Sequence, residues 1–352
     1  MANLCDDPSS SNSGAGDSSA ILNFYQSDRL FRDRYRVLKP LGKGGFGITY
    51  LAQDVDLPAQ PYCVIKQLHP KTRNQGSLER AKVRFHREAK ALASLGSHSQ
   101  IPRLLDYFTT GGKFYLVQDY IQGQTLAQEV RQRGRQTEAQ VKYFLAEILP
   151  VVEFIHRNRI IHRDIKPPNI IRSTLDRRLV LIDFGAVRQF LSDIEDGLDQ
   201  QPAATQFVGT PGFAPPEQLA LRPCYSSDIY ALGITCLFLL TGCTPVEFVQ
   251  DAHTGELCWH HRATVSAHFS SVLDKMLCPS PVDRYPSVGV LARELDLEPH
   301  LDSLAQCLHG RRSGSGSSPR FDSLPLDRYL TPTQREAHAI RQWRNKRLNQ
   351  VS

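Results

Sequence analysis

The pattern of apolar and polar positions divides the chain into a strand-rich part and a helix-rich part. Short apolar runs with strand character lie at 35–41, 48–52, 62–66 and 114–121. A helical stripe lies among them, because apolar residues recur at the spacing of one helix face: Leu78, Ala81, Phe85, Leu92 and Leu95. The pattern therefore predicts strands and one helix before residue 122.

Beyond Gly123 the period of the apolar positions becomes helical. A long amphipathic helix, with Pro150 as a predicted kink, is indicated by the stripe of Val141, Phe144, Leu145, Ile148, Val152 and Ile155. The most apolar run, 229–240, is too short to span a bilayer. We therefore expect no integral membrane segment.

The two ends of the chain differ in composition from its middle. Residues 1–34 are predicted to be a disordered leader, since the Ser, Gly, Asn and Asp at its start offer little apolar surface to offset ordering entropy. Residues 300–330 are predicted to be a flexible linker, because they contain a run of Gly and Ser. Residues 331–352 are predicted to form a basic helix that starts with a capping-box pattern.

The predicted basic helix has more than one interpretation. A narrow apolar stripe of Ala337, Ile340 and Trp343 lies beside several arginines. Docking on the folded part of the chain, or plain solvation, is the simpler interpretation. An acidic partner, nucleic acid or a membrane surface is the alternative.

Composition narrows the class of protein. Hydrophobic residues make up 41% of the 352 residues, enough for a core, and the net charge of +6 is too small to favour a dedicated nucleic-acid binder. The 8 cysteines include no C-x-x-C pair, which argues against a disulfide framework or a zinc ribbon and favours a reducing compartment. Because residues 1–19 lack the apolar core of a signal peptide, we expect a soluble, cytoplasmic protein.

A glycine-rich sequence, Gly42-Lys43-Gly44-Gly45-Phe46-Gly47, connects the first two predicted strands. Glycines allow backbone N–H groups to approach phosphate oxygens without a side chain in the way. A dinucleotide-binding turn would lead into a helix, whereas a second strand follows here. The sequence therefore favours a hairpin that covers phosphates, with a merely flexible hairpin as the alternative.

Two charged residues occupy apolar patterns. Lys66 ends the apolar run 62–66, and Glu88 lies in the middle of the helical stripe at 78–95. A buried ammonium and a buried carboxylate each need a partner of opposite charge. We therefore predict a Lys66–Glu88 ion pair; a partly exposed glutamate at the helix margin is the alternative.

The densest group of chemically active residues lies at 161–169, Ile-His-Arg-Asp-Ile-Lys-Pro-Pro-Asn, where two prolines keep the backbone out of a helix. Asp164 can accept a proton from a hydroxyl, Lys166 can neutralise negative charge, and Asn169 offers an oxygen to a hard cation. Asp183 ends the apolar run 179–182 and is placed to bind a cation as well. Ordinary turns are the alternative for both segments.

These motifs resemble those of the eukaryotic-type Ser/Thr protein kinases. The resemblance covers residues 35 to about 299 and includes H-R-D-x-K-x-x-N at 162–169, D-F-G at 183–185 and A-P-P-E at 214–217. The A-P-P-E and G-G-F-G-x-T-Y variants are most similar to bacterial, particularly cyanobacterial, members. Lys166 and Gly209-Thr210-Pro211 resemble the Ser/Thr branch more than the tyrosine branch.

The resemblance implies an α+β fold of two lobes, a small, mainly β N-lobe at 35–121 and a larger, mainly α C-lobe at 122–299. It implies transfer of the γ-phosphoryl group of ATP to hydroxyls of protein substrates in bacterial signalling, together with autophosphorylation. The expected metal is Mg²⁺, with Mn²⁺ as the alternative.

The resemblance also assigns roles to residues. Asp164 and Lys166 are the expected catalytic residues, and Asn169 and Asp183 are the expected metal ligands. Gln118 is the expected gatekeeper of the adenine slot. Thr49 and Val64 depart from the commoner valine and alanine of the family, which puts the fit of the adenine in doubt. The expected ATP-binding residues are Leu41, Gly42, Gly44, Gly45, Phe46, Gly47, Thr49, Val64, Lys66, Glu88, Gln118, Asp119 and Ile121.

Further residues are expected to support the site. Glu217 is expected to pair with Arg284. Asp228 is expected to anchor the backbone of the catalytic loop, which is the segment 161–169. A hydrophobic spine is expected to link the lobes, formed by Leu92, Leu104, His162 and Phe184.

Residues 186–208 suit a mobile activation segment. Thr205 is the expected phosphate acceptor, and Arg163 would bind its phosphate. Thr210 is expected to hydrogen-bond the catalytic loop. The alternative partners of Arg163 are acidic residues of the segment itself: Asp193, Glu195, Asp196 and Asp199.

Two other classes of function stay open. A pseudokinase would bind nucleotide and signal through partner contacts, although every reacting position is present here. Alternatively, the basic helix at 331–352 carries the main function and the kinase-like part regulates it.

Overall fold

The computed structural model describes residues 21, 29–44, 47–68, 75–96, 98–110, 112–184, 188–189, 210 and 212–297. The chain divides into two compact units, 1–299 and 300–352, and all the described residues belong to the first. The predicted linker, the predicted basic helix and Thr205 lie outside the described residues, as does most of the predicted leader.

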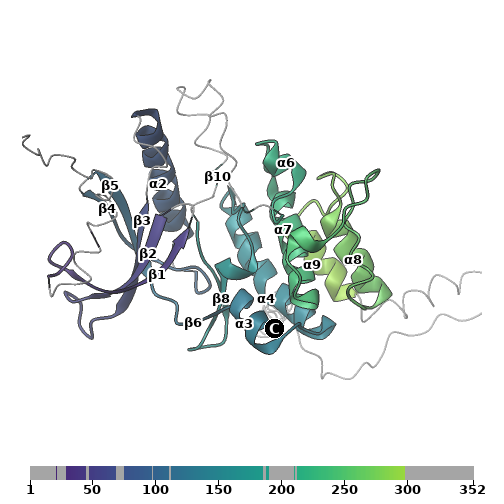
Figure 1. Cartoon of the computed structure of the whole chain (residues 1–352), viewed down its shortest axis with the longest axis horizontal. Helices are drawn as coiled ribbons and strands as arrows, with labels where there is room; N and C mark the ends of the chain where they lie inside the picture. Colours follow the sequence, from purple (N-terminus) through teal and green to yellow (C-terminus); the bar gives the residue numbers. More distant parts are fainter. Residues whose placement is uncertain are drawn as a thin grey trace, which may run out of the picture. The chain divides into compact units, whose positions relative to one another are not determined.

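A five-stranded antiparallel sheet, ordered β1-β2-β3-β5-β4, forms the first part of the fold (Figure 1). Gly44 and Gly47 pair at the end of the β1-β2 hairpin, so the glycine-rich sequence lies at its tip as predicted. The predicted strands and helix are present with these bounds: β1 (Tyr35–Gly44), β2 (Gly47–Asp54), β3 (Tyr62–Leu68), α2 (Gln75–Leu95), β4 (Leu104–Thr110) and β5 (Lys113–Asp119).

One face of the sheet buries an aromatic cluster that includes residues before β1. Tyr35, Tyr50 and Tyr115 are buried there, and the ring centroid of Phe31 lies 5.0 Å from that of Tyr115. Ile21 is fully buried in the same cluster. Contacts with the sheet therefore begin before Tyr35, inside the range predicted to be a leader.

The other face of the sheet carries α2. Phe85 and Ala89 of the helix pack with Leu116 of β5. Leu116 lies directly opposite Lys66 in the sheet register, and side chains of directly opposed residues point to the same face. This places Lys66 on the face that meets Glu88 of α2.

Helices dominate the part of the chain after β5, with two small sheets of order β6-β8-β9 and β10-β7. The helix α4 runs unbroken through Pro150. The elements are β6 (Gly123–Thr125), α3 (Leu126–Arg133), α4 (Glu138–Arg157), β7 (Ile160–Ile161), η1 (Pro167–Asn169), β8 (Ile170–Ser173), β9 (Leu179–Leu181), β10 (Arg188–Gln189), α6 (Pro216–Leu219), α7 (Tyr225–Thr241), η2 (Pro245–Glu247), α8 (Ala267–Leu277) and α9 (Val288–Leu297).

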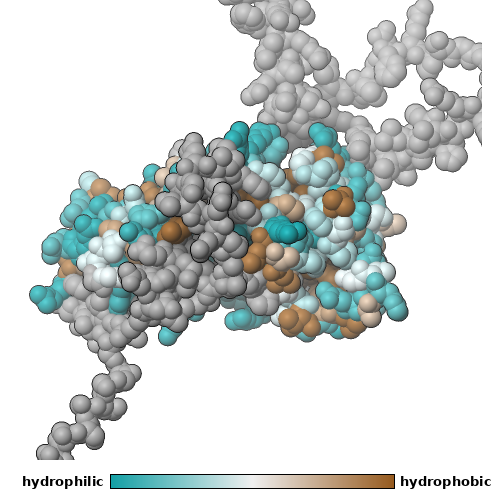
Figure 2. Space-filling model, turned by 90° about the horizontal axis from the view of Figure 1, so that it is seen from above, coloured by the Kyte–Doolittle hydropathy of each residue, from teal (hydrophilic) through white to brown (hydrophobic). Residues whose placement is uncertain are grey.

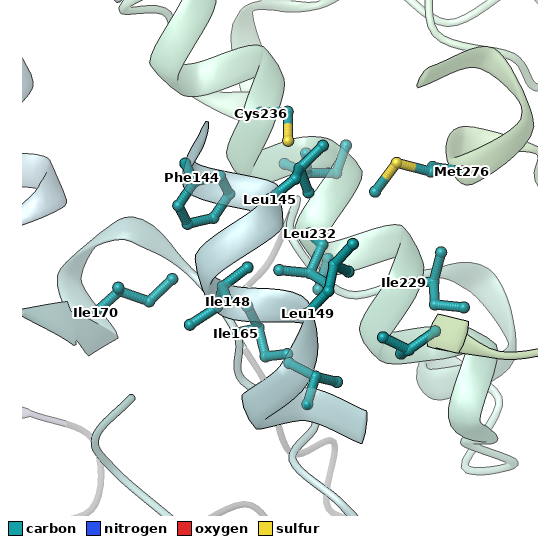
Figure 3. Packing of buried hydrophobic residues seen from close by; sticks show 14 of the residues in the cluster. Phe144, Leu145, Ile148, Leu149, Ile165, Ile170, Ile229, Leu232, Cys236 and Met276 are labelled. Carbon is teal, nitrogen blue, oxygen red and sulfur yellow. The ribbon is translucent and has the colours of Figure 1, made fainter. Parts of the chain in front are cut away.

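The core of this second part is centred on α4 and α7 (Figure 3). Leu145 and Leu149 of α4 and Leu232 of α7 are buried in it. α7 is apolar on nearly every side, and a helix of this kind is stable only when it is enclosed. Close packing against α8 needs Gly233, where a Cβ would lie 2.9 Å from Leu277 Cδ2. Asp228 is the charged residue of α7, and it is fully buried in the first turn.

The exposed surface mixes hydrophilic and hydrophobic side chains, as Figure 2 shows for one face. The large apolar side chains with high exposure include Tyr143, Leu175 and Val282, which belong to different parts of the chain. Single exposed apolar residues of this kind are normal in folded proteins. No helix among the described residues is long and apolar enough to cross a membrane.

Candidate active site

Lys66 of β3 lies between two carboxylates. Its Nζ is 2.8 Å from Glu88 Oε1 of α2 and 2.6 Å from Oδ1 of Asp183, which follows β9. The predicted Lys66–Glu88 pair is therefore present, and Asp183 is a second partner that the sequence did not assign to Lys66. The Glu88 side chain is 2% exposed and that of Asp183 is 29% exposed, so only the Asp183 side of the cluster reaches solvent.

The charges of this cluster set its titration behaviour. Burial alone lowers the pKa of Lys66, but the carboxylates of Asp183 and Glu88 outweigh it, so the pKa is raised. Burial raises the pKa of Glu88, against the opposing effect of Lys66. Lys66 is therefore a stable cation that can attract phosphate oxygens.

Asp164, in the loop between β7 and β8, is the centre of a hydrogen-bonded group. Its carboxylate accepts hydrogen bonds from Asn169 Nδ2 at 3.0 Å and Thr210 Oγ1 at 2.8 Å, and it lies 2.8 Å from Lys166 Nζ. Lys166 Nζ also donates to Thr210 Oγ1 over 2.6 Å. Thr210 thus contacts the catalytic loop as expected. The two predicted catalytic residues, Asp164 and Lys166, contact each other through the Asp164 carboxylate.

Asn169 and Asp183 are held on neighbouring backbone segments. The amide nitrogen of Asn169 donates both to the Asp164 carbonyl oxygen and to its carboxylate, at 2.9 and 3.0 Å, which directs the amide oxygen away from Asp164. The backbone N–H of Ile182 donates to the carbonyl of Asn169 at 2.9 Å. A carboxylate and an amide oxygen presented in this way are donors that Mg²⁺ accepts alongside phosphate oxygens, so the residues fit the predicted metal.

Arg163 and Asp183 have unusual backbone conformations, with φ of +66° and +68°. Such conformations are uncommon for residues other than glycine and concentrate at functional sites. Asp228 holds the backbone at Arg163, as predicted. Its carboxylate accepts hydrogen bonds from the N–H groups of His162 at 2.9 Å and Arg163 at 2.8 Å. Burial opposes ionisation of Asp228, but the hydrogen bond from His156 and the neighbouring donors lower its pKa below the ordinary value.

The side chain of His162 is buried and packs against Phe184. Its ring meets that of Phe184 edge-on, with centroids 4.9 Å apart, and burial lowers its pKa. Leu92 and Phe184 belong to the same buried cluster, against which Leu104 packs. Three of the four residues predicted to form a spine therefore share one hydrophobic cluster, and His162 contacts that cluster through Phe184.

The predicted Glu217–Arg284 pair is present, with nitrogen–oxygen distances of 2.6 and 3.0 Å. Of the predicted ATP-binding residues besides Lys66 and Glu88 that the structure describes, Ile121 follows β5, and the rest lie on β1, β2, β3 and β5. Thr49 is directly opposite Lys66, and Val64 is directly opposite Gln118. Gly45 and Phe46 lie outside the described residues, and contacts of all these residues with a nucleotide stay a prediction.

The structure adds contacts that the sequence did not identify. His156 Nε2 lies 2.8 Å from Asp228 Oδ2, and Gln218 Nε2 donates to the Arg163 carbonyl over 2.7 Å. Arg103 binds the Asp119 carboxylate through Nε at 2.8 Å and Nη2 at 3.2 Å. His156, Gln218 and Arg103 belong to none of the motifs found in the sequence, and no periodicity indicates which polar side chain of a helix or loop reaches a distant backbone group.

Comparison with known proteins agrees with this geometry. Residues 35–295 match the family described as protein kinase domain, and the chain belongs to that family. The sheet-based first part and the helical second part are accordingly the two lobes of a protein kinase, which confirms the predicted fold class.

Similar proteins are named serine/threonine-protein kinases and come from cyanobacteria, as the motif variants predicted. The chain is 47% identical over 319 residues to serine/threonine-protein kinase B of Synechocystis sp., which covers 86% of this chain and 55% of that protein. It is 43% identical over 272 residues to serine/threonine-protein kinase PknA of Nostoc sp., which covers 77% and 48%. The chain therefore spans about half the length of these relatives.

Proposed function

We propose that the chain is a Ser/Thr protein kinase that transfers the γ-phosphoryl group of ATP to hydroxyls of protein substrates and of itself. The observation that carries the proposal is the arrangement of Asp164, which Lys166, Asn169 and Thr210 contact at the same time. The names of the similar cyanobacterial proteins support the same activity.

The proposed mechanism depends on positioning. Lys66 would bind phosphate oxygens of ATP, and Asp183 and Asn169 would hold Mg²⁺, with Mn²⁺ as the alternative ion. When bound, the metal supplies charge neutralisation of the triphosphate. Asp164 would orient the substrate hydroxyl and accept its proton while the new bond to the γ-phosphorus forms and the bond to the leaving ADP oxygen breaks. Lys166, beside Asp164, would stabilise the transferred phosphoryl group.

The remaining assignments belong to the same proposal. The hairpin at 41–49, Val64 and the residues from Gln118 to Ile121 would surround the nucleotide. The proposed lobe boundaries are 35–121 and 122–299. They are preceded by the segment 1–34, of which Ile21 and Phe31 pack on the sheet, and followed by the segments at 300–330 and 331–352. Cytoplasmic signalling fits the composition and the absence of a spanning helix among the described residues.

Transfer of radiolabelled phosphate from ATP to the chain and to a generic protein substrate tests the proposed activity. The full chain should transfer phosphate, and Asp164→Asn should not. A chain ending at residue 330 should retain activity if the basic segment is accessory. Nucleotide binding without transfer would favour the pseudokinase, and loss of a nucleic-acid or lipid interaction on truncation would favour the tail as the main functional element.

We also propose that Thr205 is autophosphorylated and that its phosphate is bound by Arg163. Such a phosphate carries nearly two negative charges and accepts about one to three charge-assisted hydrogen bonds. Thr205→Ala should lower activity markedly, with phosphate mapped at Thr205 of the wild type by mass spectrometry. Full activity of the variant after phosphatase treatment, with no phosphate between residues 186 and 210, would contradict it.

A further inference from the structure

The catalytic loop has a second attachment besides Asp228. Gln218, in the short helix α6, is 3% exposed, and its Nε2 donates to the backbone carbonyl of Arg163 over 2.7 Å. We propose that Gln218 is a positioning residue for Asp164. Gln218 links α6, which follows the activation segment in the chain, to the catalytic loop without the need for a phosphate. The role of Asp164 in this proposal rests on the proposed kinase function.

Successive peptide units before Asp164 are each held by a different bond. The N–H of His162 and the N–H of Arg163 donate to the two oxygens of Asp228. The next peptide unit joins Arg163 to Asp164, and its carbonyl accepts from Gln218. At the other end of that unit, the Asp164 N–H has, among the described residues, a single long contact of 3.3 Å with His162 Nδ1. Gln218 is therefore the strongest restraint on the peptide plane from which the Asp164 side chain projects.

That restraint acts where the backbone needs one. Arg163 has φ of +66°, a sparsely populated conformation that is strained for a residue with a side chain. A strained backbone persists only when its surroundings hold it in place. Without the bond from Gln218, the Arg163–Asp164 peptide can rotate toward a commoner conformation and carry the Asp164 carboxylate away from Asn169 and Thr210.

Gln218 is itself in a fixed position. The preceding residue, Glu217, binds Arg284 at 2.6 Å and accepts from Ser227 Oγ at 2.7 Å. The N–H of Gln218 donates to the carbonyl of Pro215, within the same turn. Two neighbouring residues of α6 therefore contact different parts of the C-lobe. Glu217 binds Arg284, and Gln218 binds the catalytic loop. Since Thr210 binds the Asp164 carboxylate, the segment 210–218 holds Asp164 by both its side chain and its backbone.

The chemistry of the contact identifies variants that separate donation from packing. Gln218→Met keeps the length and approximate volume of the side chain but cannot donate a hydrogen bond. Gln218→Glu keeps the shape, but the ionised carboxylate faces a carbonyl oxygen and can donate only when it is protonated. Gln132→Met is the matched control, because Gln132 is exposed on α3.

Transfer kinetics of the full-length chain provide the first test. We expect Gln218→Met to lower kcat by about tenfold to a hundredfold, since small misplacements of a catalytic group have effects of this size, while KM for ATP changes by less than about twofold. For Gln218→Glu, the ratio of its kcat to the wild-type kcat should rise as the pH is lowered from 8 to 6, whereas the ratio for Gln218→Met should stay constant. Gln132→Met should match the wild type. Wild-type kcat for Gln218→Met would overturn the proposal.

Hydrogen exchange measured by mass spectrometry provides a second test that does not depend on phosphate transfer. Peptides covering 160–169 should exchange faster in Gln218→Met than in the wild type, whereas peptides from α4 should be unchanged. If the wild type transfers no phosphate but this difference is present, the proposed function fails and the positioning contact stands. Equal exchange in both chains, or faster exchange throughout the C-lobe, would mean that Gln218 only packs or only stabilises the fold.

Discussion

The buried cations Lys66 and Arg284 are both paired with carboxylates, but their surroundings differ. The Arg284 side chain is 0% exposed, and it binds both oxygens of Glu217. Its remaining N–H groups donate to the carbonyls of Ser226, Cys278 and Pro279, at 3.1, 2.6 and 2.9 Å. The five donors of the guanidinium therefore have five oxygen partners within the fold.

Lys66, by contrast, has a contact that a ligand can replace. Of its three donors, two reach Glu88 and Asp183, and Asp183 is 29% exposed. A phosphate oxygen or a metal can replace the Lys66–Asp183 contact without opening the core, whereas no ligand can reach Arg284. A saturated buried cation is suited to a structural role, whereas a cation with a solvent-facing partner is suited to the proposed binding of ATP.

The largest expected effect comes from removing the saturated cation. Arg284→Met leaves the Glu217 carboxylate and several carbonyls without donors, and breaking a buried pair in this way costs about 3 to 5 kcal/mol of unfolding free energy. Denaturant unfolding measures the loss. The control is Arg157→Met, because Arg157 is 75% exposed and its partner is the glutamate one helical turn away, Glu153, and exposed pairs contribute about 1 kcal/mol or less. Equal losses in the two variants would remove the distinction between the two cations.

Asp183→Asn tests the solvent-facing partner of Lys66. The amide keeps the shape of the carboxylate but carries no charge to hold a divalent cation. We expect transfer to fall by about a hundredfold to a thousandfold, the usual effect of removing one electrostatic contact, while the unfolding free energy changes by less than about 1 kcal/mol. Asp176→Asn, on an exposed turn, is the control for transfer. Wild-type turnover of Asp183→Asn would exclude the proposed role of Asp183.

The sequence predicted those contacts that motifs and periodicity specify. Glu88 was identifiable because a carboxylate interrupted an apolar stripe, and the partner was identifiable because a lysine ended an apolar strand. The strand and helix order followed from the change of period near Gly123. Asp228 and Arg284 were assigned by resemblance alone, and the structure shows both contacts.

Contacts between a side chain and a distant backbone group could not be predicted. Gln218 reaches the Arg163 carbonyl because of the path of the chain between 210 and 218, which no local pattern specifies. The positive φ of Arg163 and Asp183 was likewise not visible, since arginine does not favour this conformation and aspartate, although enriched there, adopts it in only a small fraction of cases. Burial of Ile21 and Phe31 was missed because the polar composition of the first residues dominated the assignment of the leader.

Lys66→Met should destabilise the fold less than Arg284→Met, by about 1 to 3 kcal/mol, because Asp183 reaches solvent and Glu88 can take up a proton. Burial already raises the pKa of Glu88, and loss of Lys66 raises it further. A carboxyl group whose folded pKa exceeds its unfolded value, about 4.3, destabilises the fold as the pH rises. The deficit of the variant relative to the wild type should therefore be smaller at pH 5 than at pH 8, as measured by urea unfolding. A deficit that grows on acidification would contradict this account.

The smallest effect concerns Asp228, whose carboxylate responds to pH in the opposite sense to Glu88. Its pKa is lowered because His156 and the backbone N–H groups of His162 and Arg163 donate to it, and these contacts outweigh its burial. The stabilisation from ionised Asp228 is therefore fully present above the unfolded pKa of about 3.9, and it is lost as the pH falls through the folded pKa. The difference in unfolding free energy between the wild type and Asp228→Asn should be constant from pH 8 to pH 5 and should narrow in more acidic solution. A difference that widens below pH 5 would show that the folded state favours the protonated carboxyl over the ionised one. Asp228 would then resemble Glu88, a group for which burial outweighs its partners.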